Sequence, residues 1–331
     1  MTGIIETAHA VVANIANQVG GTFLLPGSTF SLAALSASLL VFVAVVLAGK
    51  RRRRFRRAVL IRALFPRRMV RTASGRTDLA FFIGGILFSG MTIGWAVFAA
   101  GDIRAAIERL AGPPPSPLLP HWIAIPAVTL LLFVAYEFAY WLDHWLKHRV
   151  AFFWHFHKVH HQAESLSLLT NGRVHPVDTI VFYNIVAVVT GATAALAGRL
   201  VGDVGPVAIG GTNALIMLSA VAITHLQHSH LWLRFGARGS QWLLGPAHHQ
   251  IHHSTDPRHF DRNLGSTLAL FDRAFGTFFL PPEQRGAMRF GVDDGEPDPH
   301  GWLATLFTPF AAATALLAPR SRIKIEELAK E

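Results

Sequence analysis

The chain of 331 residues contains no cysteine. This absence excludes disulfides, thiolate metal sites, iron–sulfur clusters and cysteine nucleophiles, so any bound metal must be held by nitrogen and oxygen. Charged residues are also scarce, because Asp, Glu, Lys and Arg together make up 15% of the chain whereas 51% of the residues are hydrophobic. That balance favours an integral membrane protein over a pair of soluble domains.

Acidic residues are fewer than basic ones, 20 against 30, which gives a formal net charge of +10. Much of the excess lies between Arg51 and Arg68, directly after an apolar run. Basic residues in that position are typical of the cytoplasmic end of a membrane span. We therefore interpret the charge as a topology signal and expect no nucleic-acid partner.

The apolar runs predict five membrane spans, at about residues 30–48, 79–99, 123–142, 179–198 and 204–223, since a bilayer crossing needs roughly 20 apolar residues. With the arginine run inside, the N-terminus lies outside. The expected fold is an all-α integral membrane protein of about five transmembrane helices, with a cytoplasmic helical cap that carries histidine clusters. In a bacterium it would lie in the inner membrane.

Fifteen of the 18 histidines lie between His144 and His259. Pairs spaced i,i+3 or i,i+4 share one helix face, so each cluster can direct several imidazoles to one point. The candidate metal ligands are His144, His148, His157, His160, His161, His225, His228, His249, His252 and His253. Ten ligands are too many for one metal of coordination number about four to six, so the pattern predicts two metals. A single histidine is more often a surface residue, but four clusters on one side of the membrane favour ligation.

The third cluster, from Thr224 to His230, has irregular spacing. We expect His228 to ligate first and His225 next, with His230 beside a ligand. The polar residues expected to support the ligands are Glu137, Asp143, His175, His230, Asp256 and Asn263. A carboxylate such as Glu137 or Asp143 would fix the tautomer by accepting an imidazole N–H, or would be an ordinary membrane-interface carboxylate.

Three motifs carry a family resemblance: H-x-x-x-H at His144–His148, and H-x-x-H-H at both His157–His161 and His249–His253. Together with the segment from Ser254 to Thr277, they resemble the integral-membrane fatty acid hydroxylase and sterol desaturase superfamily. The resemblance covers about residues 136–278. It implies a non-haem centre of two Fe that uses O₂ as co-substrate, a membrane lipid as substrate and a separate electron donor.

The resulting division of the chain has four parts. Residues 1–29 form an interfacial segment, 30–120 two transmembrane helices with loops, 121–280 the hydroxylase-like catalytic domain, and 281–331 a tail with an interfacial helix. No oligomeric state follows from the sequence.

The similarity after His253 to bacterial members favours hydroxylation of a C–H bond in a fatty acyl chain, sterol or other isoprenoid. Two alternatives stay open: a lipid desaturase with the same di-iron site, and a histidine-rich metal-binding membrane protein without oxygenase activity. A zinc hydrolase is disfavoured because the chain has no H-E-x-x-H. A metal transporter is disfavoured because the first, second, fourth and fifth predicted spans carry almost no ionisable ligands.

Overall fold

The computed structural model describes residues 2–25, 28, 30–48, 67–93, 97–117, 119–294 and 300–316. The arginine run at 51–57 therefore lies outside the described residues. The longer helices are α1 (Thr2–Leu24), α2 (Leu32–Ala48), α5 (Ala73–Ile93), α6 (Ala100–Ala111), α7 (His121–Arg149), α8 (Ala151–His161), α9 (Pro176–Val201) and α14 (Trp302–Ala315). The shorter ones are α4 (Arg68–Arg71), α10 (Ala214–Ala222), α11 (Gly236–Gly239), α12 (Pro246–His252), α13 (Leu270–Ala274), η1 (Leu168–Gly172), η2 (Thr224–Leu226) and η3 (Pro257–His259). The predicted helical class is confirmed.

Two described helices, α7 and α9, are long and apolar enough to cross a bilayer, with 29 and 26 residues. At 1.5 Å per residue they extend about 40 Å, against about 30 Å of hydrocarbon. They pack against each other. Helix α9 begins cleanly because Pro176 occupies its first turn and the His175 side chain accepts a hydrogen bond from the Val177 N–H. These helices fit a membrane protein, and the number of spans stays a prediction.

The continuous helix predicted over 204–223 is present only in its second half. Strands β1 (Ala208–Ile209) and β2 (Thr212–Asn213) form an antiparallel hairpin in the first half. Its two turn residues, Gly210 and Gly211, have φ of 58° and 80°, as a two-residue type I′ turn requires. The nine residues of α10 extend only about 14 Å, so this helix alone is too short to cross.

The return of the chain towards the histidines is made by the hairpin, α10 and η2 in sequence. Thr129 of α7 anchors the hairpin, since its hydroxyl accepts a hydrogen bond from the Val207 N–H at 2.8 Å and its carbonyl accepts one from the Asn213 side chain at 2.9 Å. The first bond satisfies the Val207 N–H, a backbone group that the broken helix leaves open, and the second ties the hairpin to α7.

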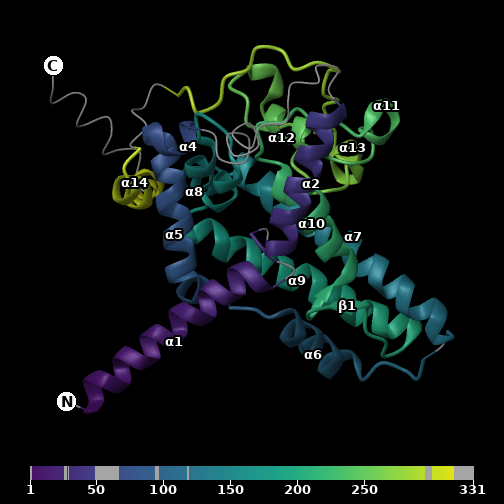
Figure 1. Cartoon of the computed structure of the whole chain (residues 1–331). Coiled ribbons are helices and arrows are strands. Elements are labelled where there is room, and N and C mark those ends of the chain that lie inside the picture. Colours follow the sequence, from purple (N-terminus) through teal and green to yellow (C-terminus); the bar gives the residue numbers. More distant parts are fainter. Residues whose placement is uncertain are drawn as a thin grey trace, which may run out of the picture.

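A cap of short helices and loops lies at the C-terminal end of α7. Only Val150 separates α7 from α8, and α14 packs against α8. Figure 1 shows α8, α12 and α13 gathered at one end of the molecule, while α1 extends away from the other. The predicted cap therefore exists as a helical layer that joins the ends of several longer helices.

Candidate metal centre

The cap brings histidines together in two groups. The first histidine group is His144, His148, His157, His161 and His252. The second histidine group is His160, His228, His249 and His253. Within each group the candidate ligand atoms lie within 4.8 Å of one another. Nine of the ten predicted ligands are in these groups, and His225 lies outside both.

Helical spacing explains how two groups form side by side. His144 and His148 are one turn apart on α7, and His157 and His161 are one turn apart on α8. His160 on α8 is turned towards the second group, so α8 contributes to both groups, as α12 does through its C-terminal end. The rings of His161 and His253, one from each group, are stacked with centroids 4.5 Å apart. The chain therefore offers two neighbouring metal positions.

The Nδ1 atoms of six of these histidines contact oxygen atoms of the protein. The contacts are His144 to the Leu264 carbonyl (2.7 Å), His148 to Asp261 (3.2 Å), His157 to Asp178 (2.9 Å), His160 to the Arg173 carbonyl (3.1 Å), His228 to Asn171 (2.7 Å) and His252 to the Arg262 carbonyl (2.9 Å). Carbonyl and carboxylate oxygens only accept, so Nδ1 donates its hydrogen. The lone pair of each neutral ring then lies on Nε2, inside the group.

The distances between the Nε2 atoms show whether this set of nitrogen donors fits a metal. In the second group the Nε2 atom of His228 lies 2.9 Å from that of His160 and 2.8 Å from that of His249. With Nδ1 protonated on His160 and His228, two lone pairs face each other across 2.9 Å. In the first group the Nε2 atoms of His144 and His157 are buried without a hydrogen-bond partner. A cation among these nitrogens would remove the repulsion and satisfy the lone pairs, and imidazole nitrogen suits iron and zinc.

Burial also sets the protonation of these rings. Desolvation lowers the pKa of His160 to about 3. It likewise lowers the pKa values of His161, His228, His249 and His252 well below the ordinary value. At neutral pH these imidazoles are therefore neutral, which is the form that binds metal.

The metal-free protein is expected to lose stability as the pH falls from about 7 to about 5. Imidazoles of the unfolded chain take up protons near the ordinary pKa of 6.5, whereas His160 in the folded protein does so only at about 3. Between these values the unfolded state binds more protons, so the free energy of unfolding decreases as the pH falls. Thermal unfolding in detergent with a chelator measures the effect. A melting temperature that rises or stays constant over this range would contradict it.

A buried ion network supports the first histidine group. The Asp178 carboxylate, in the first turn of α9, accepts the Nδ1–H of His157 and pairs with the Lys147 ammonium of α7. Lys147 also pairs with Asp143, one turn earlier on α7. All three charged side chains are at most 6% exposed. The network fixes the His157 tautomer and joins α7 to α9.

The two carboxylates expected to hold imidazoles make other contacts. Asp143 pairs with Lys147, and Glu137 accepts hydrogen bonds from the backbone N–H groups of Thr267 and Leu268 at 2.8 and 2.7 Å. Within the described part of the chain neither contacts a candidate ligand. The physical reason is that backbone N–H groups bond to Glu137 and the Lys147 ammonium pairs with Asp143. Glu137 therefore ties α7 to the segment before α13.

The other predicted supporting residues also bond elsewhere. His175 caps α9 through Nδ1 and donates from Nε2 to the Leu306 carbonyl of α14. Asn263 donates to the His248 carbonyl and accepts from the Phe279 N–H. Asp256 caps η3 and pairs with Arg258, while His230 is exposed. Among the described residues none of the four bonds to a ring nitrogen of the two groups.

Sequence reasoning missed three side chains that do contact candidate ligands: Asp178, Asp261 and Asn171. Asp178 and Asn171 flank the His175-Pro176 pair, so the signal was a carboxylate and an amide close to a histidine motif. Asp261 has a φ of 57°, which turns the chain after α12 back towards His148. Only the folded chain brings these residues next to their histidines, which are 21, 113 and 57 positions away.

Comparison with known proteins gives the following matches. Residues 129–277, which include both histidine groups, match the family model described as fatty acid hydroxylase. The alkylglycerol monooxygenase of Xenopus tropicalis is 26% identical over 47% of this chain and 31% of its own length. The ornithine lipid hydroxylase OlsE of Rhizobium tropici is 30% identical over 58% of this chain and 52% of its own.

The alkylglycerol monooxygenase of Caenorhabditis elegans is 24% identical over 43% of this chain and 25% of its own. The chain thus spans about half or less of the length of these relatives. No solved structure matches the chain.

Proposed function

We propose that this chain is a membrane di-iron oxygenase that hydroxylates a C–H bond of a lipid. The premise is that the chain belongs to the fatty acid hydroxylase family through residues 129–277. The family match confirms the resemblance predicted from the histidine motifs. The relatives carry the names of a hydroxylase and a monooxygenase, which supports an oxidoreductase.

The observation that carries the proposal is the pair of adjacent groups of buried histidines. Nine imidazoles in two groups supply enough nitrogen ligands for two metals and leave positions open for a co-substrate. A di-iron centre held there would supply the activation of O₂ for oxidation of an unreactive C–H bond. Iron is proposed over zinc because the relatives are named for oxygenase reactions.

In this proposal the protein holds the metals, orients the imidazole ligands and excludes water from the site. The Nδ1–H contacts orient six of the nine rings, and burial keeps imidazoles such as His160 and His161 neutral. Aromatic rings close the first group, since Trp154 lies 5.3 Å from His148 and 5.4 Å from His161 between ring centroids, and Tyr140 lies 5.9 Å from His144. Such a wall excludes water from a reactive centre.

The substrate class follows from the setting of the site. The centre lies at the end of α7, one of the two helices long enough to cross a bilayer, where an acyl chain or ring system leaving the bilayer would reach it. The relatives are named for reactions on alkylglycerol or ornithine lipid, which supports a lipid such as a fatty acyl chain, sterol or other isoprenoid. Electrons come in this proposal from a separate donor.

Lipid profiling with ¹⁸O₂ tests the function. Cells that express the protein are expected to contain a lipid with one oxygen atom from ¹⁸O₂ that cells without the gene lack. Loss of two hydrogens without added oxygen would favour the desaturase. Bound iron with a lipid profile identical to that of the cells without the gene would favour a metal-binding protein without oxygenase activity.

The topology that we propose places both histidine groups in the cytoplasm. Reporter fusions after Arg57, Gly112, His161, Asp203 and Ser254 are expected to read in, out, in, out and in. The reading at Asp203 is the most informative because the segment after it is a hairpin followed by the short helix α10. External readings at His161 or Ser254 would contradict the topology.

A further inference from the structure

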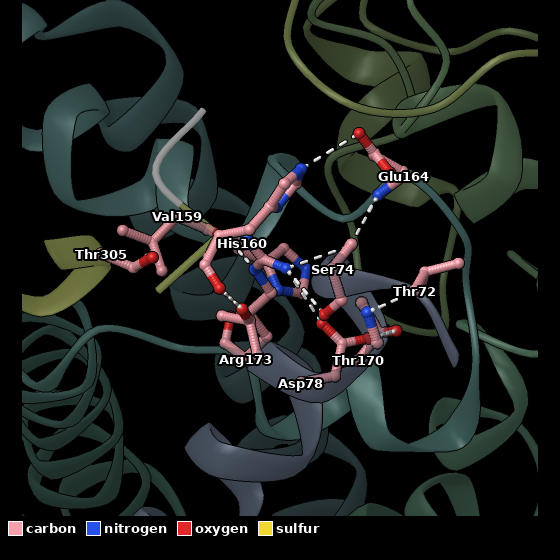
Figure 2. Close-up of polar contacts among 12 residues, drawn as sticks. Thr72, Ser74, Asp78, Val159, His160, Glu164, Thr170, Arg173 and Thr305 are labelled. Carbon is pink, nitrogen blue, oxygen red and sulfur yellow. Dashed lines mark hydrogen bonds and ion pairs between the residues drawn. The ribbon is translucent and has the colours of Figure 1, made fainter. Parts of the chain in front are cut away.

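A buried arginine on the segment after α8 lies next to the second histidine group (Figure 2). Arg173 is fully buried, and its guanidinium donates to the Val159 carbonyl at 2.7 Å and to Asp78 at 3.1 Å. It also contacts the hydroxyl of Ser74 at 3.3 Å. Asp78 and Ser74 belong to α5, and Asp78 is 1% exposed. A buried guanidinium without a counter-charge is costly, so Asp78 holds Arg173 in place.

Asp78 also binds the residue directly before Asn171. Its second carboxylate oxygen accepts the Thr170 hydroxyl at 2.8 Å, and Thr170 is fully buried. Between these two contacts Gly172 lies directly against α5, where an added Cβ would be 3.4 Å from the Cα of Phe82. One carboxylate therefore clamps η1 and Arg173 onto α5.

The clamped segment orients two members of the second histidine group. The Arg173 carbonyl accepts the Nδ1–H of His160 at 3.1 Å. The Asn171 carbonyl oxygen accepts the Nδ1–H of His228 at 2.7 Å. The Asn171 amide nitrogen donates to the carbonyls of His225 and Leu168, at 3.0 and 3.1 Å, so its oxygen faces His228.

The first histidine group takes its supports from elsewhere. Its Nδ1 contacts go to Leu264, Asp261, Asp178 and Arg262. None of these residues lies between Leu168 and Arg173, and none bonds to Asp78 within the described residues. The orienting contacts of the two groups are therefore separate.

We propose that Asp78 is a positioning residue which, through Arg173 and the clamped η1, sets the ring orientations of His160 and His228 and so controls occupancy of the second metal position alone. This inference rests on the proposed function, because it assumes a metal in each group. It also extends the site beyond the family-matched segment, since α5 precedes residue 129. The second metal position then depends on a helix outside that segment.

The experiment compares the full-length wild type, D78N, N171A and the control E164Q in detergent. Glu164 lies beside the network in Figure 2, but its side chain bonds to His300 and not to the clamped segment. Loss of a residue that orients a ligand typically weakens metal binding about 10- to 100-fold. D78N and N171A are thus expected to hold about one iron per chain where the wild type and E164Q hold about two.

Two readouts separate positioning from general damage. Elemental analysis gives the iron ratio, and electron paramagnetic resonance distinguishes an isolated iron from a coupled pair. N171A leaves the Asp78–Arg173 ion pair intact. It therefore tests the orientation of His228 by the clamped segment even if D78N does not fold. Retention of both irons with unchanged affinity in N171A would overturn the inference and leave the proposed function standing. Loss of both irons from folded N171A would also overturn it, whereas a wild type without iron would overturn the proposed function itself.

Discussion

Replacing His252 by Ala is expected to lower lipid oxidation more than about 100-fold, because loss of a ligand exceeds the roughly 10- to 100-fold cost of losing a residue that only orients one. The His252 ring lies 4.5 Å from that of His144 and 4.7 Å from that of His161, between ring centroids, so it contacts members from both α7 and α8. His160→Ala is expected to have the same effect through the second group. The measurement is the amount of ¹⁸O-labelled lipid in cells that express each variant at equal levels.

His155→Ala is the matched control. His155 belongs to α8 like His160, but it is only half-buried and lies outside both histidine groups. It should retain most of the wild-type oxidation. If the His252→Ala and His160→Ala variants each kept full activity, these groups would not hold the catalytic metals and the proposed mechanism would be wrong.

Replacing Lys147 by Met is expected to lower the free energy of unfolding by about 3–5 kcal/mol, the usual cost of breaking a buried ion pair from one side. The Lys147 side chain is 6% exposed, and those of its partners Asp143 and Asp178 are 5% and 4% exposed. Without the lysine, two buried carboxylates face each other with no cation between them. Thermal unfolding of the metal-free protein in detergent gives the change.

Arg149→Met provides the comparison two residues further along α7. The Arg149 side chain is 52% exposed and lies 3.5 Å from Asp261, and exposed pairs contribute about 1 kcal/mol or less. Equal melting temperatures for Lys147→Met and the wild type would mean that the buried network contributes little, and that α7 and α9 are held together by apolar packing.

The chemistry of the candidate site was more predictable than its surroundings. Helical spacing alone places His157 and His161 on one face and His160 on the next, which is how α8 contributes to two groups. His225 was expected at the metals, but it occupies η2, donates from Nδ1 to the Ala220 carbonyl and lies outside both groups. Periodicity describes a regular helix, and the chain around His225 is a single turn of 3-10 helix.

The partners of the ligands could not be predicted, because they depend on distances across the fold. Asp143 is next to His144 in sequence, yet its carboxylate forms an ion pair with Lys147, one turn further along α7. Asp261 is 113 positions from His148 and contacts it. The continuous helix predicted over 204–223 is only half formed for a different reason: hydropathy measures apolar character, and Gly210-Gly211 turns the first half of an apolar stretch into a hairpin.

The order of the ligands along the chain has a consequence for biosynthesis. The first histidine group has four members before α9 and one after it, whereas the second has one before and three after. When the ribosome has completed α9, the first position has most of its nitrogens and the second has a single imidazole. In the proposed di-iron centre, loading of iron during translation could therefore begin at the first position only. The second position would be filled after His253 has been synthesised and α12 has docked on α8, so a nascent chain stalled before Gly245 should carry no more than one iron.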